Sequence, residues 1–219
     1  MNMKTKYPIY IEISIIIAMF LLALYFYPLM PYKMVTHFDF YGIPNGFMVR
    51  FWGIFLLPFI SLLLYVLFRA ILYIDPLKEN IKSFRIYYNV FVDIFLILML
   101  YLELSLILWN VGIKINILRF LTIPIGLFYI YIGVLLGKSK RNWFIGIRTP
   151  WTLTSDYVWD KTNKLAGKFF IIDGIFVMLS FFFSRLLLIF MLYIVLLGLF
   201  IIAIYSYVLW AKTKTEELK

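Results

Sequence analysis

Residues 51–74 read FWGIFLLPFISLLLYVLFRAILYI, and Arg69 is the single charged side chain in this stretch. An α-helix rises 1.5 Å per residue, so a helix of this length extends about 36 Å, enough to cross a hydrocarbon core of about 30 Å. The stretch has the length and the composition of a transmembrane helix. It therefore predicts an integral membrane protein.

The rest of the chain has the same character. Hydrophobic residues make up 64% of the 219 residues, well above the roughly 45–50% usual in soluble domains. Further apolar runs cover about 8–28, 84–109 and 115–137. A last block, 168–210, would reach roughly 64 Å as one helix, so we expect it to break at Ser184-Arg185 into two spans. The predicted fold is an all-α bundle of six transmembrane helices.

The basic residues predict the orientation of this bundle. With the amino terminus in the cytoplasm, fifteen of the 21 lysines and arginines fall on the cytoplasmic side: Lys4, Lys6, Lys78, Lys82, Arg85, Lys138, Lys140, Arg141, Arg148, Lys161, Lys164, Lys168, Lys212, Lys214 and Lys219. Five fall outside: Lys33, Arg50, Lys114, Arg119 and Arg185. Cytoplasmic loops carry the excess of positive charge in membrane proteins. We therefore expect a multi-pass protein of the cell membrane with both termini in the cytoplasm.

The composition also excludes several kinds of chemistry. The chain has no cysteine and a single histidine, His37. Disulfides, thiolate catalysis and multi-histidine metal sites are therefore excluded, and we expect no metal, no cofactor and no enzymatic activity. The net charge of +10 is explained by basic loops that face the lipid surface rather than by direct binding of nucleic acid.

The segment between the first two spans is the first candidate site. Residues 36–47 read THFDFYGIPNGF. Asn45-Gly46 favours a tight turn with positive φ, and the alternating aromatic residues indicate a short hairpin at the outer membrane surface. Two interpretations stay open. His37 and Asp39, at alternate strand positions, form a ligand-contacting or proton-exchanging pair, or they cap one another in an aromatic loop without a ligand.

The longest polar segment is the second candidate site. Residues 141–159 read RNWFIGIRTPWTLTSDYVW. Pro150 disfavours helix at Thr149, so the backbone turns there. Thr154 or Ser155 can cap a short helix that begins near Asp156. Three tryptophans among basic residues are typical of an interfacial helix or re-entrant turn at the cytoplasmic leaflet. The segment is either a binding site or a lipid anchor without a partner.

Four acidic residues lie within the predicted spans: Glu12, Asp93, Glu103 and Asp173. Each costs about 2.5–3.5 kcal/mol in a membrane helix unless it is paired, hydrated or neutral, so such residues usually face the bundle interior. Glu12, Asp93 and Asp173 lie nearer the cytoplasmic ends of their spans. The four acids either form structural pairs or line a path for a polar ligand or an ion.

Arginine is the expected partner of these acids. Arg141 or Arg148 can neutralise the three inner acids, and Glu103 can meet Arg119 or His37. The planar guanidinium binds a carboxylate through two parallel hydrogen bonds. We therefore expect Arg148 to fold back from its loop and to pair with at least one of the inner acids.

Both polar segments resemble the SdpI family, bacterial and archaeal membrane proteins named for immunity to a secreted peptide toxin. The resemblance in the inner segment includes Arg141, Asn142, Gly146, Arg148, Thr149, Pro150, Trp151, Asp156 and Trp159. The inner segment resembles the signature of the family. The outer segment is similar to an uncharacterised domain that precedes this signature in longer members, through His37, Phe38, Asp39, Gly42, Pro44 and Asn45. The expected regions are 1–110, with the outer loop, and 111–219, with the signature.

The resemblance implies an immunity or sensor protein without enzymatic activity. Its expected partners are the lipid bilayer, a secreted peptide toxin and a cytoplasmic transcriptional repressor. The outer loop would meet the peptide through His37, Asp39, Asn45, Glu103 and Arg119, and the inner loop would report or recruit. The alternative is a small transporter or proton-coupled carrier, which the intramembrane acids favour and the absence of an internal repeat disfavours.

The predicted orientation can be tested with reporter fusions. A reporter fused after Lys140 is expected to be active in the cytoplasm, and one fused after Gly46 is expected to be active outside, because of the uneven distribution of positive charge. The activities of two complementary reporters, one active on each side of the membrane, measure this. The opposite pattern would overturn the orientation.

Overall fold

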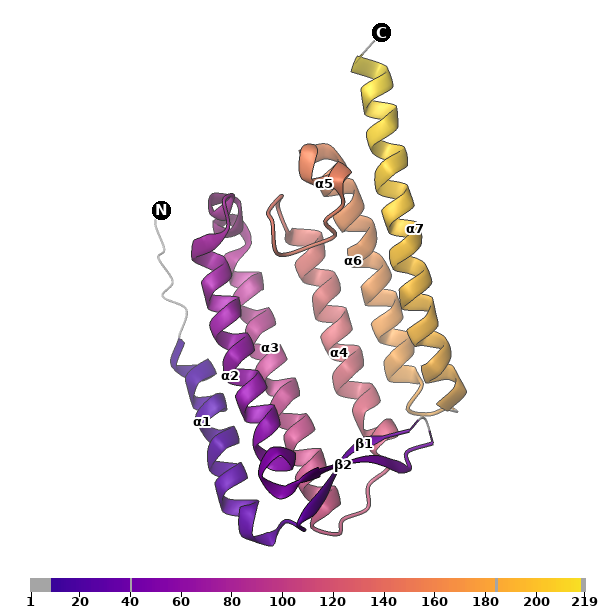
Figure 1. Ribbon diagram of the computed structural model, residues 1–219. Coiled ribbons are helices and arrows are strands. Elements are labelled where there is room, and N and C mark those ends of the chain that lie inside the picture. Colours follow the sequence, from indigo (N-terminus) through magenta and orange to yellow (C-terminus); the bar gives the residue numbers. More distant parts are fainter. Residues whose placement is uncertain (1–8, 40, 184, 218–219) are drawn as a thin grey trace. The chain divides into compact units, whose positions relative to one another are not determined.

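The computed structural model describes residues 9–39, 41–183 and 185–217, and for 185–192 and 217 it describes the backbone alone. Apart from one hairpin and a 3-10 turn, the described elements are α-helices (Figure 1). In chain order they are α1 (Ile9–Phe26), η1 (Tyr27–Leu29), β1 (Lys33–Phe38), β2 (Pro44–Val49), α2 (Arg50–Ile74), α3 (Lys78–Asn110), α4 (Ile117–Lys138), α5 (Pro150–Thr154), α6 (Asp156–Leu179) and α7 (Arg185–Glu217).

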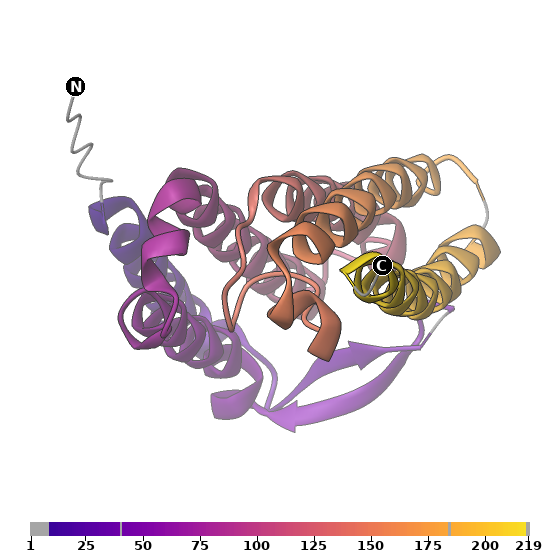
Figure 2. The same ribbon diagram turned by 90° about the horizontal axis from the view of Figure 1, so that it is seen from above.

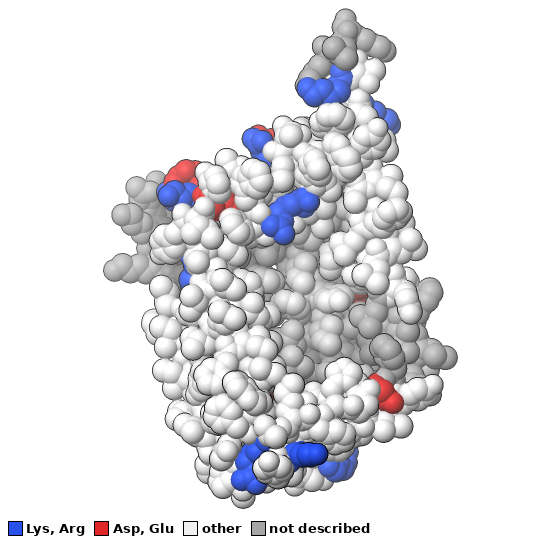
Figure 3. Space-filling view, in the orientation of Figure 1, with Lys and Arg blue, Asp and Glu red and all other residues white. Residues whose placement is uncertain are grey.

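Five stretches of the described chain are long and apolar enough to cross a membrane. They are Ile9–Leu29, Arg50–Ile74, Arg85–Asn110, Ile117–Lys138 and Tyr193–Glu216. Most of the Lys and Arg side chains visible in Figure 3 lie near helix ends, and the helix surfaces between them are largely uncharged. Length, composition and charge distribution together define an integral membrane protein with a helical fold.

The helices differ from the predicted spans mainly at their polar ends. α3 begins at Lys78, six residues before the predicted span, and Phe84 has non-helical dihedral angles (φ −122°, ψ 19°), so the helix kinks there. The last apolar block divides as expected, because α6 ends at Leu179 and α7 begins at Arg185. Ser184, half of the predicted break, lies outside the described residues.

The chain forms two compact units. The first consists of Met1–Phe68 with Val92–Leu121, and the second consists of Arg69–Phe91 with Thr122–Lys219. The core of the first unit joins α1, the hairpin, α2 and α3. Its buried residues are Ala23, Met30, Met34, Ile54, Phe55 and Ile107. Asn110, in the last turn of α3, donates to the carbonyl oxygen of Val35 and accepts from its N–H, both at 2.9 Å. The hairpin is thereby attached to α3 of the same unit.

In the second unit, α6 packs against α4 on one side and α7 on the other. Both views show α6 and α7 side by side (Figures 1 and 2). The buried core residues are Leu136, Ala166, Phe170, Val195 and Ile202. α4 approaches α6 through glycines, since a Cβ added at Gly133 would lie 2.4 Å from the carbonyl oxygen of Gly167, and one at Gly126 would lie 2.6 Å from that of Gly174. Small residues are the usual means by which membrane helices approach closely.

Candidate functional site

The polar segment between α4 and the first turns of α6, residues 139–163, is called the signature segment below. It lies against the turn that joins α2 to α3, within the second unit. Asp75 in this turn is buried, and its Oδ1 and Oδ2 accept from the N–H groups of Leu77 (2.6 Å) and Trp143 (2.9 Å). Asn80 Nδ2 donates to the carbonyl oxygen of Arg141 (2.7 Å). A buried carboxylate and an amide therefore hold the signature segment in place.

Asn142 organises the first half of the signature segment. Its side chain is fully buried and makes four hydrogen bonds. Nδ2 donates to the carbonyl oxygens of Lys140 (2.7 Å) and Ile145 (2.8 Å), and Oδ1 accepts from the N–H groups of Phe144 (2.9 Å) and Ile145 (2.6 Å). The amide thus satisfies backbone groups that the loop itself leaves unpaired. Neither a carboxylate nor an aliphatic side chain can make this set of bonds.

Gly146 and Trp159 fix the second half of the loop to α6. Asn163 Oδ1 accepts from the N–H of Ile147 (2.7 Å), and Trp159 Nε1 donates to the carbonyl oxygen of Ser139 (3.2 Å). Gly146 has φ of +126°, and a Cβ there would lie 2.8 Å from Asn163 Oδ1. Glycine is required by both the dihedral angle and the space. Trp159 is buried, so it is part of the packing and not an exposed lipid anchor.

The short helix α5 begins where the sequence predicts a turn. Thr149 is its N-cap with extended backbone (φ −110°, ψ 163°), and Pro150 follows in the first turn. The Thr149 hydroxyl accepts a hydrogen bond from the N–H of Thr152 (3.2 Å), and the Thr152 hydroxyl accepts one from the N–H of Thr149 (2.8 Å). This reciprocal pair is a capping box. The Thr149 hydroxyl also lies 2.9 Å from that of Ser206. In addition, the Trp151 ring packs on α7, with its centroid 5.1 Å from that of Tyr207.

The next helix, α6, is capped by Ser155, whose hydroxyl accepts from the N–H of Val158 at 3.4 Å. Ser155 is one of the two capping residues that the sequence predicts, and Thr154 is the other. The helix itself is much longer than predicted, because it continues from Asp156 to Leu179.

The arginines do not pair as predicted. Arg141 Nε donates to Asp156 Oδ1 (2.7 Å), and its Nη1 donates to the carbonyl oxygen of Leu153 (2.9 Å). Arg148 is exposed, and its Nη1 donates to the carbonyl oxygen of Trp143 (2.6 Å) in the same segment. The expected ion pair between Arg148 and an inner acid is therefore wrong. Both guanidiniums satisfy nearby carbonyl groups of their own loop.

The acids of the helices also differ from expectation. Glu12, Glu103 and Asp173 are buried, and Asp93 is partly buried. No carboxylate oxygen of Glu103 or Asp173 has a hydrogen-bond partner among the described residues. The predicted pairing of Glu103 with Arg119 or His37 is therefore wrong. The backbone N–H of Arg119 donates to Asn116 Oδ1 in the first turn of α4 (3.1 Å).

The hairpin forms as predicted, with β1 and β2 antiparallel, but its turn lies elsewhere. Asp39 Oδ1 accepts from the N–H groups of Tyr41 (2.8 Å) and Ile43 (2.9 Å), and Gly42 has φ of +75°. Asn45-Gly46 lies within β2. The Asp39 carboxylate fixes the turn at this position because it accepts hydrogen bonds from two backbone N–H groups there.

The remaining polar pair of the hairpin joins its two strands. His37 Nδ1 lies 2.5 Å from Asn45 Oδ1, and this pair is exposed. The structure therefore brings His37 together with Asn45, whereas Asp39 binds the backbone of the turn.

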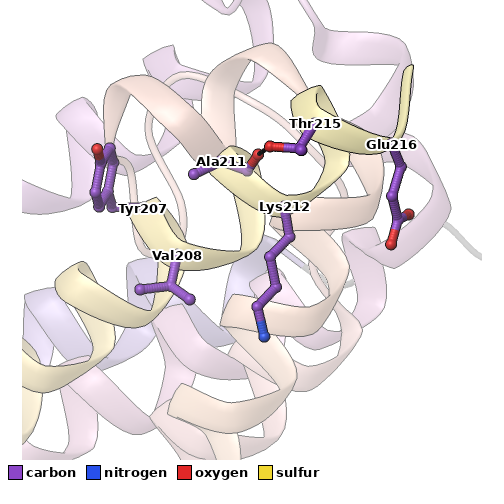
Figure 4. A pocket seen from close by; sticks show the side chains of 6 residues that line it. All are labelled: Tyr207, Val208, Ala211, Lys212, Thr215 and Glu216. Atoms are coloured by element: carbon purple, nitrogen blue, oxygen red, sulfur yellow. Dashed lines mark hydrogen bonds between the residues drawn. The ribbon is translucent and has the colours of Figure 1, made fainter. Parts of the chain in front are cut away.

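One further hollow lies outside these two sites. Figure 4 shows it on the last turns of α7. It is lined by Tyr207, Val208, Ala211, Lys212, Thr215 and Glu216. All six residues come from one helix, so the hollow is a surface groove and not an enclosed site.

Sequence reasoning missed Asp75 and Asn80, which contact the signature segment from 61 to 68 residues away in the chain. The Asp75-Pro76 pair is a typical turn signal, but nothing local indicates what its carboxylate binds.

These features define a multi-pass membrane protein with a hairpin and an internally bonded signature segment. The chain belongs to the SdpI/YfhL protein family, which it matches over residues 138–208, and residues 14–62 match a "Domain of unknown function (DUF1648)". It is 30% identical over 198 residues to the Immunity protein SdpI of Bacillus subtilis (strain 168), across 90% of this chain and 93% of the relative. The predicted resemblance is confirmed. No solved structure gives a significant match.

The buried amide of Asn142 generates a test of the site. Asn142→Asp is expected to lower the free energy of unfolding by about 2–4 kcal/mol, because it removes two donors and buries a carboxylate against two carbonyl groups. Thermal unfolding of the purified protein in detergent measures this. Asn116→Asp is the matched control, since Asn116 only accepts a bond from a helix N–H and should unfold like the wild type. Equal stability of all three proteins would contradict the role given to Asn142.

Proposed function

We propose that the protein is a membrane immunity protein that protects its host against a membrane-active peptide toxin. The observation that carries the proposal is the similarity to an immunity protein over nine tenths of the chain. The signature segment supports the proposal. It lies within the residues that match the family, and its side chains hydrogen-bond to its own backbone. The proposed activity is binding and not catalysis.

We further propose that the chain crosses the membrane six times with both termini in the cytoplasm. The sixth span is α6, whose 24 residues extend about 36 Å as a helix. Lys164 and Lys168 lie toward its beginning, where long side chains reach the cytoplasmic surface. The basic signature segment then lies inside and the hairpin lies outside, in agreement with the charge distribution.

In this arrangement the hairpin is the recognition surface. His37 and Asn45 are exposed and joined side chain to side chain, so they are available to a peptide outside the cell. Asp39 supports them indirectly by fixing the turn. The proposed regions remain 1–110 for recognition and 111–219 for the signature.

The signature segment is proposed to report to the cytoplasm. Its backbone is fixed by buried side chains, whereas Trp143, Phe144 and Tyr157 are exposed large hydrophobic residues and Arg148 is exposed. Aromatic residues and arginine are enriched where proteins bind proteins. This exposed set fits a cytoplasmic partner such as a transcriptional repressor.

The alternative is a small transporter or proton-coupled carrier. The observation in its favour is the burial of Asp173 and Glu103 with carboxylate oxygens that lack partners in the described part of the chain. Intramembrane acids of this kind often belong to ion or proton paths. The two acids belong to different units. They support a carrier function only if transport requires both of them.

A protection assay tests the proposal. A toxin-sensitive host that expresses the chain should survive a higher dose of culture supernatant from Bacillus subtilis strain 168, the source of the related immunity protein. His37→Ala should reduce this protection about fivefold at equal membrane abundance, because it removes a contact of about 1 kcal/mol.

The same assay contains its controls. Asp173→Asn should protect like the wild type, and loss of protection with this variant would favour the carrier. Unchanged protection across an alanine scan of 36–47 would exclude the side chains of these residues from recognition. Absence of protection by the wild-type chain would contradict the immunity function.

A further inference from the structure

The two edges of the hairpin are not equivalent. On the outer edge of β1, the N–H and the carbonyl oxygen of Val35 both bond to the side-chain amide of Asn110, each at 2.9 Å. This amide takes the place that a neighbouring strand would occupy. The sheet of the described residues contains two strands, so no third strand covers the outer edge of β2.

The register identifies which backbone groups point out from β2. The N–H of Arg50 donates to Tyr32 (2.9 Å), so Arg50 points toward the β1 side. Backbone groups alternate in direction along an antiparallel strand. Val49 and Phe47 therefore point outward, with Met48 between them pointing inward. The pairing of Val35 with Phe47 agrees, because Val35 also points away from the partner strand.

The side chains around this edge are apolar and accessible. Phe47 is 58% exposed and Val49 is 43% exposed. The two side chains lie on the same face of the strand, since they are two residues apart. Tyr41 and Ile43, in the turn, are also exposed. An exposed apolar edge of this kind can pair with another polypeptide.

We propose that this edge binds an extended, apolar peptide segment as a third strand of the hairpin. The proposal rests on the immunity function and identifies how the toxin is held. Alternating N–H and carbonyl groups, about 6.8 Å apart for every second residue, match the backbone of an extended peptide. A lipid headgroup has no such repeating pattern. Backbone pairing supplies affinity in this mode of recognition, and the side chains on alternate positions supply selectivity.

The charges beside the edge favour a peptide over a second copy of this chain. Lys33 pairs with Val49 in the register, and Arg50 directly follows β2. In a parallel pairing of two copies through β2, Arg50 would lie beside Arg50 of the second copy, which is unfavourable, whereas an apolar peptide brings no charge to this position. A charged residue at the end of an edge strand is a common protection against self-association.

A proline substitution separates the backbone from the side chain. Phe47→Pro removes the outward N–H and leaves the bonds of the hairpin, because an edge position that faces away from the partner strand tolerates proline. Gly46 precedes it and has no Cβ to clash with the proline ring. Phe47→Leu keeps both the N–H and an apolar side chain. Thus Phe47→Leu is the matched control, and Val49→Pro tests the second outward N–H.

The readout is protection against the Bacillus subtilis strain 168 supernatant at equal membrane abundance. Phe47→Pro and Val49→Pro should each reduce protection about fivefold, the effect of one lost backbone hydrogen bond. Phe47→Leu keeps the N–H and should therefore lose less protection than Phe47→Pro. Full protection by both proline variants would overturn the inference and leave the immunity function intact. Equal losses with Leu and Pro at position 47 would also overturn it, since the side chain would then be responsible.

Two further outcomes complete the test. If neither proline variant accumulates in the membrane, the outward N–H groups serve the fold and the inference is overturned. A Val49→Cys variant would carry a single cysteine, because the chain itself has none. A disulfide-linked dimer of this variant in membranes, formed without added peptide, would place a second copy on the edge and contradict the assignment. A monomer supports it. Failure of the wild type to protect would contradict the immunity function and, with it, this inference.

Discussion

The carboxylate of Asp75 is the interaction on which the signature segment depends. Its two oxygens accept from Leu77, in the turn before α3, and from Trp143, in the signature segment. A buried carboxylate is costly unless it is well bonded, and a bond from a neutral donor to a charged acceptor contributes about 1.5–3 kcal/mol. The same group thus fixes a local turn and a contact 68 residues away.

The signature segment repeats this strategy with neutral amides. Asn142 and Asn163 bond backbone groups of the loop, and Thr149 caps α5. Gly146 allows the backbone to approach Asn163. The order of the loop therefore comes from buried side chains and not from the surface pair of Arg141 with Asp156, whose carboxylate is 77% exposed and whose contribution is small. An ordered loop presents its exposed aromatic residues in a fixed arrangement to the proposed partner.

The parts that hydropathy governs could be predicted from the sequence. α2 begins and ends within one residue of the predicted span, because burial in lipid sets its length. The turn of the hairpin was placed wrongly, since the intrinsic preference of Asn45-Gly46 is outweighed by the two backbone bonds of Asp39. Arg148 was expected to bind a distant acid because a guanidinium fits a carboxylate, whereas in the structure it donates to a carbonyl oxygen five residues away. Contacts of this kind depend on three-dimensional distance, which one sequence does not contain.

Hydrogen–deuterium exchange at the Trp143 amide tests the central role of Asp75 most directly. Asp75→Ala removes both acceptor oxygens, so the N–H of Trp143 loses its partner. The Trp143 amide of this variant, purified in detergent, is expected to exchange about tenfold faster than in the wild type, as for the loss of about 1.4 kcal/mol. Asp156→Ala, which removes the exposed pair, should leave the rate unchanged. An unchanged rate in Asp75→Ala would contradict the role given to Asp75.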